Sequence, residues 1–380
     1  MVKTLHQYEA IRFFKDDEVA EAIAQIQQHP MFKAMLHYSF ENEDDAYIDA
    51  LLQQCHSIAD FQQKIIRKTV EKIIDSTSDG VTDSGFEQLD KNQTYLFLSN
   101  HRDILLDSSI LNLVLMQKGM TPTANAIGDN LLGKQFQLIL SKLNRNFIVK
   151  RSASPREILH NSIVLSGYIR DLLQHQAQSV WMAQREGRTK DGNDRTQQGV
   201  LKMLSMARGT HDILSYFDAL KIVPLSISYE FDPTDILKVP EVMAKALEQD
   251  YKKTENEDFN SMLRGALGNK KRIHIAVEAP IVFSKAVKNP KAPPNDLLQE
   301  IARIIDQKIH QNYKLWPFNY LATDLLNDNK AYADFYSEKE KQLFMRRIQR
   351  RVDQDNALAM KSFLEMYARP VINTASYERL

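Results

Sequence analysis

The sequence lacks cysteine pairs, long apolar runs and an excess of charge, and each absence excludes a class of protein. Its one cysteine, Cys55, cannot form an internal disulfide. The opening residues, MVKTLHQYEAIRFFKDDE, contain no apolar signal core, so we expect a reduced, cytoplasmic chain. No run approaches the ~18 apolar residues that span a bilayer. We therefore expect no integral membrane anchor, while peripheral contact with a membrane surface stays open.

The charge is balanced overall but divided unevenly along the chain. There are 49 basic and 49 acidic residues, which argues against a protein that coats a polyanion, and we expect no nucleic-acid partner. Residues 1–90 hold 8 basic and 17 acidic residues, which leaves 41 and 32 for residues 91–380. The N-terminal part of the chain is therefore acidic and the remainder is basic, and a local basic site is possible.

Several catalytic motifs are also missing. The sequence has no Gly-x-Ser-x-Gly elbow of a serine hydrolase and no His-Glu-x-x-His zinc motif. His101-Arg102-Asp103 resembles the start of a protein-kinase catalytic loop, but Ser108 stands where that loop needs asparagine, and a glycine-rich phosphate loop is absent. These absences exclude a kinase and a serine hydrolase, and we expect neither a metal nor another bound cofactor.

What the sequence does contain is enough apolar material, 43% of 380 residues, for a large core. Apolar residues at helical spacing predict helices over 18–28 and 45–74, and a polar cluster at 75–85, DSTSDGVTDSG, predicts a boundary. Short β-rich runs then alternate with helical ones, which is typical of an α/β domain with a mostly parallel sheet flanked by helices. The expected strands are 94–99, 123–127, 146–149, 179–183, 222–229 and 273–277, and the expected helices are 104–116, 131–143, 155–175, 199–207, 240–248 and 260–267.

We therefore predict three regions. Residues 1–90 form an acidic helical N-terminal region, and residues 91–285 form the α/β domain. Residues 286–380 form a helical C-terminal region, because the chain again has the apolar spacing of helices.

The most informative stretch is SNHRDILLDSS, which places His101 between an apolar strand and an apolar helix. Strand ends are where α/β folds present reactive groups. A carboxylate at Asp103 or Asp107 would hold the imidazole in one tautomer, which makes His101 a candidate general base. Asp103 also stands where a helix would begin and is a favoured N-cap residue. We assign the orienting role to Asp107, with Asp103 as the alternative.

Four short blocks follow one another along the sequence. They are Asn100-His101 with a following Asp, Asn146 to Arg151, Arg185-Glu186-Gly187-Arg188-Thr189 leading to Gly199, and Val223 to Ile227. In this order the blocks resemble those of the glycerolipid acyltransferases, a superfamily that includes glycerol-3-phosphate and lysophosphatidic acid acyltransferases. The resemblance covers about residues 94–230, and five residues separate His101 from Asp107 where the family usually has four.

The resemblance implies acyl transfer from acyl-coenzyme A or acyl carrier protein, as co-substrates, to a hydroxyl of glycerol-3-phosphate or lysophosphatidic acid. His101 would be the general base of a direct attack, and backbone N–H groups at the helix start after it would bind the oxyanion. Two alternatives remain open: another acceptor, such as an amino-acid lipid, or a non-catalytic protein that binds acyl chains or lipids.

The same blocks supply candidate substrate-binding residues. Each of two strand ends is followed by a pair of cations, so we expect Lys150, Arg151, Arg188 and Lys190 to converge on a phosphate or pyrophosphate. Glu186 either bonds the acceptor's hydroxyls, as the family suggests, or pairs with a neighbouring arginine. Gly187 is expected to adopt a positive φ, which glycine enters without steric cost.

Two apolar segments are candidates for lipid contact. The helix at 104–116 is apolar nearly all round, which indicates burial in the core or the wall of an acyl channel. The tract Tyr313–Tyr320, YKLWPFNY, concentrates aromatic residues beside a lysine. We expect the protein to associate peripherally with the cytoplasmic face of a membrane. Because tryptophan and tyrosine favour membrane interfaces, this tract is the candidate for bilayer contact, and ordinary packing onto the domain is its alternative.

Overall fold

Seven strands form one sheet in the computed structural model of the chain, which describes residues 6–151 and 154–378. The strand order is β1-β7-β6-β2-β5-β3-β4, and every neighbouring pair is parallel except β6 and β7. The predicted α/β class with a mostly parallel sheet is thereby confirmed. The strands are β1 (Ser78–Ser84), β2 (Leu96–Ser99), β3 (Ala124–Gly128), β4 (Asn146–Val149), β5 (Val180–Ala183), β6 (Ile222–Tyr229) and β7 (Lys271–Val277).

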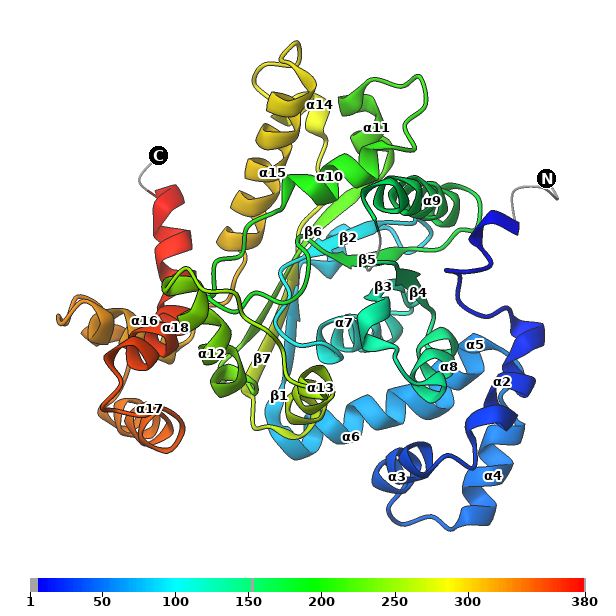
Figure 1. Cartoon of the computed structure of the whole chain (residues 1–380), viewed down its shortest axis with the longest axis horizontal. Coiled ribbons are helices and arrows are strands. Elements are labelled where there is room, and N and C mark those ends of the chain that lie inside the picture. Colours follow the sequence, from blue (N-terminus) through cyan, green and yellow to red (C-terminus); the bar gives the residue numbers. More distant parts are fainter. Residues whose placement is uncertain (1–5, 152–153, 379–380) are drawn as a thin grey trace.

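Helices cover both faces of the sheet (Figure 1). Successive side chains of a strand point to opposite faces, so Leu96 and Leu98 of β2 join one buried core while Phe97 joins the other. The first core is completed by α9 (Pro155–Gln174), α10 (Gln198–Ser205), α11 (Ile213–Ala219) and α15 (Pro294–Gln311). The second is completed by α6 (Arg67–Thr77) and α7 (Leu106–Gln117), with α13 (Glu257–Leu267) packed against it.

The N-terminal helices pack around a core of their own, together with α8 (Gln135–Leu143) of the α/β domain. They are α2 (Val19–Ile26), α3 (Pro30–Ser39), α4 (Asp45–Gln53) and α5 (Ile58–Phe61). The helical stretch predicted over 45–74 is interrupted, because the Ser57 side chain accepts a hydrogen bond from the Asp60 N–H and starts a new helix. Helix α3 was not among the predicted elements.

The segment 75–85, predicted to be a boundary, contains strand β1. This strand pairs in parallel with β7 at one edge of the sheet, and four of its residues, Asp79 and Thr82 to Ser84, are exposed. An edge strand has one open side, so it accepts polar residues that a central strand would bury. The segment is therefore part of the sheet and not a linker, and the division into three regions stays a prediction.

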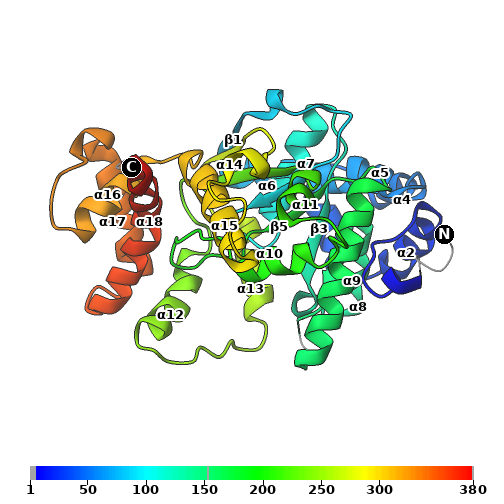
Figure 2. The same ribbon diagram turned by 90° about the horizontal axis from the view of Figure 1, so that it is seen from above.

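The C-terminal helices form a group at the opposite end of the molecule from the N-terminal ones (Figure 2). Helices α16 (Pro317–Leu326), α17 (Glu338–Arg351) and α18 (Ala357–Glu378) share a core with α12 (Asp235–Ala246). None of the helices that the structure describes is long and apolar enough to cross a membrane.

The aromatic tract Tyr313–Tyr320 lies in the interior. Tyr313, Trp316 and Phe318 are all buried, and the Phe318 ring stacks on those of Phe231 and Phe344 at centroid distances of 4.9 and 5.3 Å. The prediction of bilayer contact for this tract was wrong. Its buried aromatic side chains pack onto the domain, as the alternative prediction had it.

Candidate active site

Four loops meet at the carboxyl edge of the parallel strands and line a cleft of about 490 Å³. Strands β2, β3, β4 and β5 are mutually parallel, so the residues that follow them reach the same edge. The lining includes His101 after β2, Gly128 at the end of β3, Lys150 and Arg151 after β4, and Arg185, Glu186 and Gly187 after β5.

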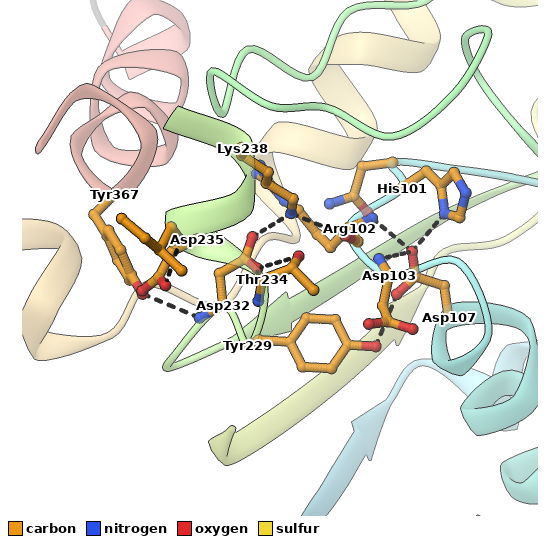
Figure 3. A network of polar contacts seen from close by, with 12 residues as sticks. His101, Arg102, Asp103, Asp107, Tyr229, Asp232, Thr234, Asp235, Lys238 and Tyr367 are labelled. Carbon is orange, nitrogen blue, oxygen red and sulfur yellow. Dashed lines mark hydrogen bonds and ion pairs between the residues drawn. The ribbon is translucent and has the colours of Figure 1, made fainter. Parts of the chain in front are cut away.

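His101 and Asp107 form a hydrogen-bonded pair at this edge (Figure 3). The distance from His101 Nδ1 to Asp107 Oδ2 is 2.7 Å, and the Asp107 side chain is fully buried while that of His101 is 13% exposed. An ionised carboxylate can only accept, so Nδ1 carries a proton, and in the neutral imidazole Nε2 then keeps a lone pair. The Trp181 ring packs edge-on against the imidazole, with 5.4 Å between the ring centroids.

Asp107 receives three further hydrogen bonds. The N–H groups of Arg102 and Asp103 donate to Oδ2 at 2.6 and 3.1 Å, and the Tyr229 hydroxyl of β6 donates to Oδ1 at 2.7 Å. Burial and the nearby carboxylates raise the pKa of Tyr229 well above its usual value, so it stays a donor. Asp107 lies in the first turn of α7 and residues 101–105 are not helical, which lets the carboxylate reach back across the five-residue spacing.

Asp103 has a different set of contacts. Its Oδ1 accepts from the N–H groups of Leu105 and Leu106, each at 2.9 Å, at the start of α7. Its Oδ2 is buried without a hydrogen-bond partner among the described residues. Burial and the neighbouring Asp107 raise the pKa of Asp103. The geometry thus makes Asp103 a helix cap and Asp107 the carboxylate that bonds the imidazole.

The expected oxyanion donors are occupied. The N–H groups of Arg102 and Asp103 donate to Asp107, and those of Leu105 and Leu106 donate to Asp103. A backbone N–H that already serves a buried carboxylate is not free for a developing oxyanion. The prediction that the helix start after His101 supplies such donors was therefore wrong for these four groups.

Arg151 is held at the rim of the cleft by three features. Its N–H donates to Asp129 at 3.2 Å, and its guanidinium packs so closely on Gly128 that a Cβ there would lie 2.7 Å from Nε. Its Nη1 lies 3.8 Å from Glu186 Oε1, so Glu186 takes the second of its two predicted contacts, pairing with an arginine. Gly187 has φ of 68°, the positive value predicted for it.

The predicted convergence of four cations is only half realised. Among the described residues that line the cleft are Lys150 and Arg151, but not Arg188 or Lys190. Arg188 is buried, with its Nη1 lacking a partner in the described part of the chain, and Lys190 lies 3.1 Å from Glu241 of α12.

Arg185 lines the cleft although it was not predicted as a site residue. A signal for it exists, because it follows the end of β5 by two residues, as Arg151 follows β4. The cations that remain in the cleft suit a phosphate or pyrophosphate. No group of three or more His, Cys, Asp or Glu side chains in residues 6–151 and 154–378 is arranged to hold a metal ion.

A second cavity, an apolar groove of about 480 Å³, adjoins the cleft. It runs between α3, α6, α8 and α13, and it shares Leu105, Ile127 and Leu131 with the cleft. Most of α7 is buried in the core, and only its beginning contributes to the groove. Further lining residues are Met31, Ala34, Met35, Ile66, Val70, Phe136, Leu140, Met262 and Leu263.

No model of a known protein family matches the sequence, and no curated protein matches it either. Among solved structures, one similar chain is the 1-acyl-sn-glycerophosphate (LPA) acyltransferase PlsC from Thermotoga maritima. The two are 14% identical, the match covers 80% of this chain and 96% of that one, and the TM-score is 0.34.

Proposed function

We propose that the chain is an acyltransferase that moves a fatty acyl group from a thioester of coenzyme A or acyl carrier protein to a hydroxyl of glycerol-3-phosphate or lysophosphatidic acid. The observation that carries the proposal is the His101–Asp107 pair, 2.7 Å apart, in a cleft that is also lined by cations and adjoins an apolar groove. A polar phosphate head and a long acyl chain need these two surroundings, with a base between them.

The chemistry follows from the tautomer of His101. Nε2 takes the proton of the acceptor hydroxyl while the oxygen attacks the thioester carbonyl, and Asp107 stabilises the imidazolium through Nδ1–H. The tetrahedral intermediate then expels the thiolate, which takes the proton from Nε2 and restores the base. A positioned general base contributes typically ~10² to 10⁴ in rate.

The acceptor phosphate is assigned to Lys150, Arg151 and Arg185. A hydrogen bond to a charged group contributes roughly 1.5 to 3 kcal/mol, and arginine can bind a phosphate with two parallel N–H donors. Arg188 and Lys190 are not among the described residues that line the cleft, so the phosphate is not assigned to them. The acyl chain is assigned to the apolar groove, because groove and cleft share part of their walls.

Contact with a membrane surface is assigned to the mouth of these cavities. Ile158, Leu159 and Ile163 are exposed on α9, and Leu263 and Leu267 are exposed on α13. Both helices project to the same side of the molecule (Figure 2), where Lys150 and Arg151 would meet anionic lipid. Sedimentation with phosphatidylglycerol vesicles tests this surface: Leu159→Asp should weaken binding, and unchanged binding would refute the assignment.

The direct test of the function is release of free thiol from palmitoyl-coenzyme A or palmitoyl-acyl carrier protein. Purified wild type and His101→Ala are compared with glycerol-3-phosphate, lysophosphatidic acid and lyso-aminolipids as acceptors. We expect release that depends on a glycerol phosphate and falls by ~10² to 10⁴ in His101→Ala. His211→Ala, which changes an exposed histidine outside the cleft lining, is the control and should keep the wild-type rate.

The other outcomes separate the alternatives. Release with lyso-aminolipids alone would replace the acceptor but keep the reaction. Binding of lipid without release from any donor, unchanged in His101→Ala, would overturn the enzyme and leave a binding protein.

A further inference from the structure

The loop that carries His101 is held from behind by Lys238, a residue of α12. The Lys238 side chain is 1% exposed, and its Nζ donates to the carbonyl oxygen of Arg102 at 2.9 Å. The same ammonium forms an ion pair with Asp232. Figure 3 shows Lys238 on the side of Arg102 away from the His101 ring.

A buried ammonium requires an explanation beyond packing. Removing an ammonium from water is costly, and an apolar side chain of similar volume commonly serves as well where only volume must be filled. Asp232 offsets the charge, but the second contact of Lys238 is directed at a main-chain carbonyl adjacent to His101. The arrangement therefore fixes a peptide group, in addition to filling space.

Three hydrogen bonds hold the backbone at this point. The Thr189 N–H donates to His101 O at 2.8 Å, the Arg102 N–H donates to Asp107 Oδ2 at 2.6 Å, and Lys238 binds Arg102 O. Asp107 Oδ2 also binds the His101 imidazole. A rotation of the Arg102 backbone would thus disturb the carboxylate oxygen that orients the ring.

The network continues outward to the C-terminal helices. The Tyr367 hydroxyl of α18 accepts from the Asp232 N–H at 3.1 Å and donates to Asp235 at 2.8 Å. Asp235 is fully buried and pairs with Arg347 and Arg351 of α17 at 2.8 and 2.6 Å. A continuous chain of contacts joins the C-terminal helices to the backbone beside His101.

We propose that Lys238 is a positioning residue for His101, and that the C-terminal helices act on the site through it. The kinetic part of this inference rests on the proposed acyl transfer, but the geometric part does not. In the described part of the chain, Lys238 is not among the residues that line the cleft, and its hydrogen bonds go to Arg102 and Asp232. Its effect passes through the Arg102 carbonyl.

The test compares Lys238→Met with Lys245→Met. Methionine keeps the length of the side chain and removes the donor, while Lys245 lies on the same helix and is exposed, paired with Asp191. A misplacement near 1 Å costs up to ~10²-fold in rate, so we expect a fall in kcat approaching that size with KM for the acceptor unchanged in Lys238→Met. Lys245→Met should match wild type.

A second readout does not depend on activity. The Nδ1–H proton of His101, bonded to Asp107, is followed by nuclear magnetic resonance in histidine-labelled protein. We expect its resonance to move or broaden in Lys238→Met and to stay in place in Lys245→Met. If Lys238→Met does not fold, Tyr367→Phe, which removes one hydroxyl and keeps the ring, should move or broaden the same resonance.

The outcomes separate this inference from the proposed function. A folded Lys238→Met with unchanged kcat and an unchanged imidazole resonance overturns the positioning role, as does an unmoved resonance in Tyr367→Phe where that variant replaces it. Absence of acyl transfer in wild type overturns the proposed function, while the resonance still decides whether Lys238 positions His101.

Discussion

The two helical regions that flank the α/β domain are attached to it in different ways. The N-terminal helices meet the domain through an apolar core, in which Phe32 and Phe61 join Ile139 and Leu143 of α8. The C-terminal helices also share an apolar core, but they add buried ion pairs between α17 and Asp235. One attachment is mainly apolar and the other is apolar and ionic.

The difference matters because the two kinds of contact constrain geometry differently. Apolar burial is non-directional and tolerates small shifts, which suits helices that form the wall of a groove. A buried ion pair with hydrogen bonds has a defined geometry and is costly to break, which suits helices linked to the backbone beside His101. We therefore expect changes in the N-terminal helices to alter which acyl chains bind, and changes in the C-terminal helices to alter stability and the alignment of His101.

The largest effect is expected from Asp235→Ala. It would leave the buried Arg347 without its carboxylate partner. Breaking a buried ion pair in this way costs about 3–5 kcal/mol of the free energy of unfolding. Glu41→Ala removes an exposed N-terminal pair with Lys72, for which we expect a loss below about 1 kcal/mol. Urea unfolding measures the free energy of unfolding of both variants. Equal losses would contradict the difference between the two attachments.

An intermediate effect is expected from Lys270, which ties α6 of the N-terminal region to the sheet. Its buried Nζ donates to Thr77 Oγ1, Ala266 O and Gly268 O at 2.7, 2.9 and 2.7 Å, and burial lowers its pKa from 10.5 to about 8. Between these values the unfolded chain keeps a proton that the folded chain has released. The free energy of unfolding should therefore rise with pH across this window, by up to about 3 kcal/mol.

The measurement is urea unfolding of wild type and Lys270→Met at a series of pH values from neutral to about the ordinary lysine pKa of 10.5. The variant lacks the titrating group, so the difference between the two slopes isolates Lys270. Identical slopes in the two proteins would show that Lys270 keeps its ordinary titration.

The smallest effect is expected from narrowing the groove. Ala34 of α3 is exposed and lines the groove, so Ala34→Phe should obstruct a long acyl chain without disturbing a core. We expect the rate with a palmitoyl donor to fall about 10-fold relative to a butyryl donor. Ala24→Phe, an exposed position on α2 outside the groove lining, is the control. A loss that is the same for both donors would remove the groove as the acyl site.

Local pattern was sufficient to predict that His101 follows a strand and that Asp107 bonds its imidazole. The strand-to-helix junction marked the histidine, and the choice of Asp107 over Asp103 followed from the N-cap preference of aspartate. Strand β1 was missed because an edge strand can be polar, so its composition matches that of a loop. The oxyanion prediction failed because the sequence does not show that Asp103 and Asp107 already accept hydrogen bonds from these N–H groups.

Contacts between residues distant in sequence could not be predicted in the same way. Tyr229 reaches Asp107 from a strand 122 residues away, and Lys238 reaches the Arg102 carbonyl across 136 residues. A lysine or tyrosine in an apolar stretch carries no local mark of its partner. The exclusion of Arg188 and Lys190 from the cleft depends on how the loop after β5 turns, which likewise has no local signal.

The sequence by itself determined the α/β alternation, the position of His101 at a strand end and the carboxylate within its reach, because periodicity and helix capping are local properties. The tertiary structure alone decided that the ends of β2, β3, β4 and β5 share one edge, that an apolar groove opens beside them, and that the C-terminal helices reach the Arg102 backbone. Each local segment permits several strand pairings and helix contacts. One arrangement is selected because it gives the whole chain the lowest free energy when all segments are buried together.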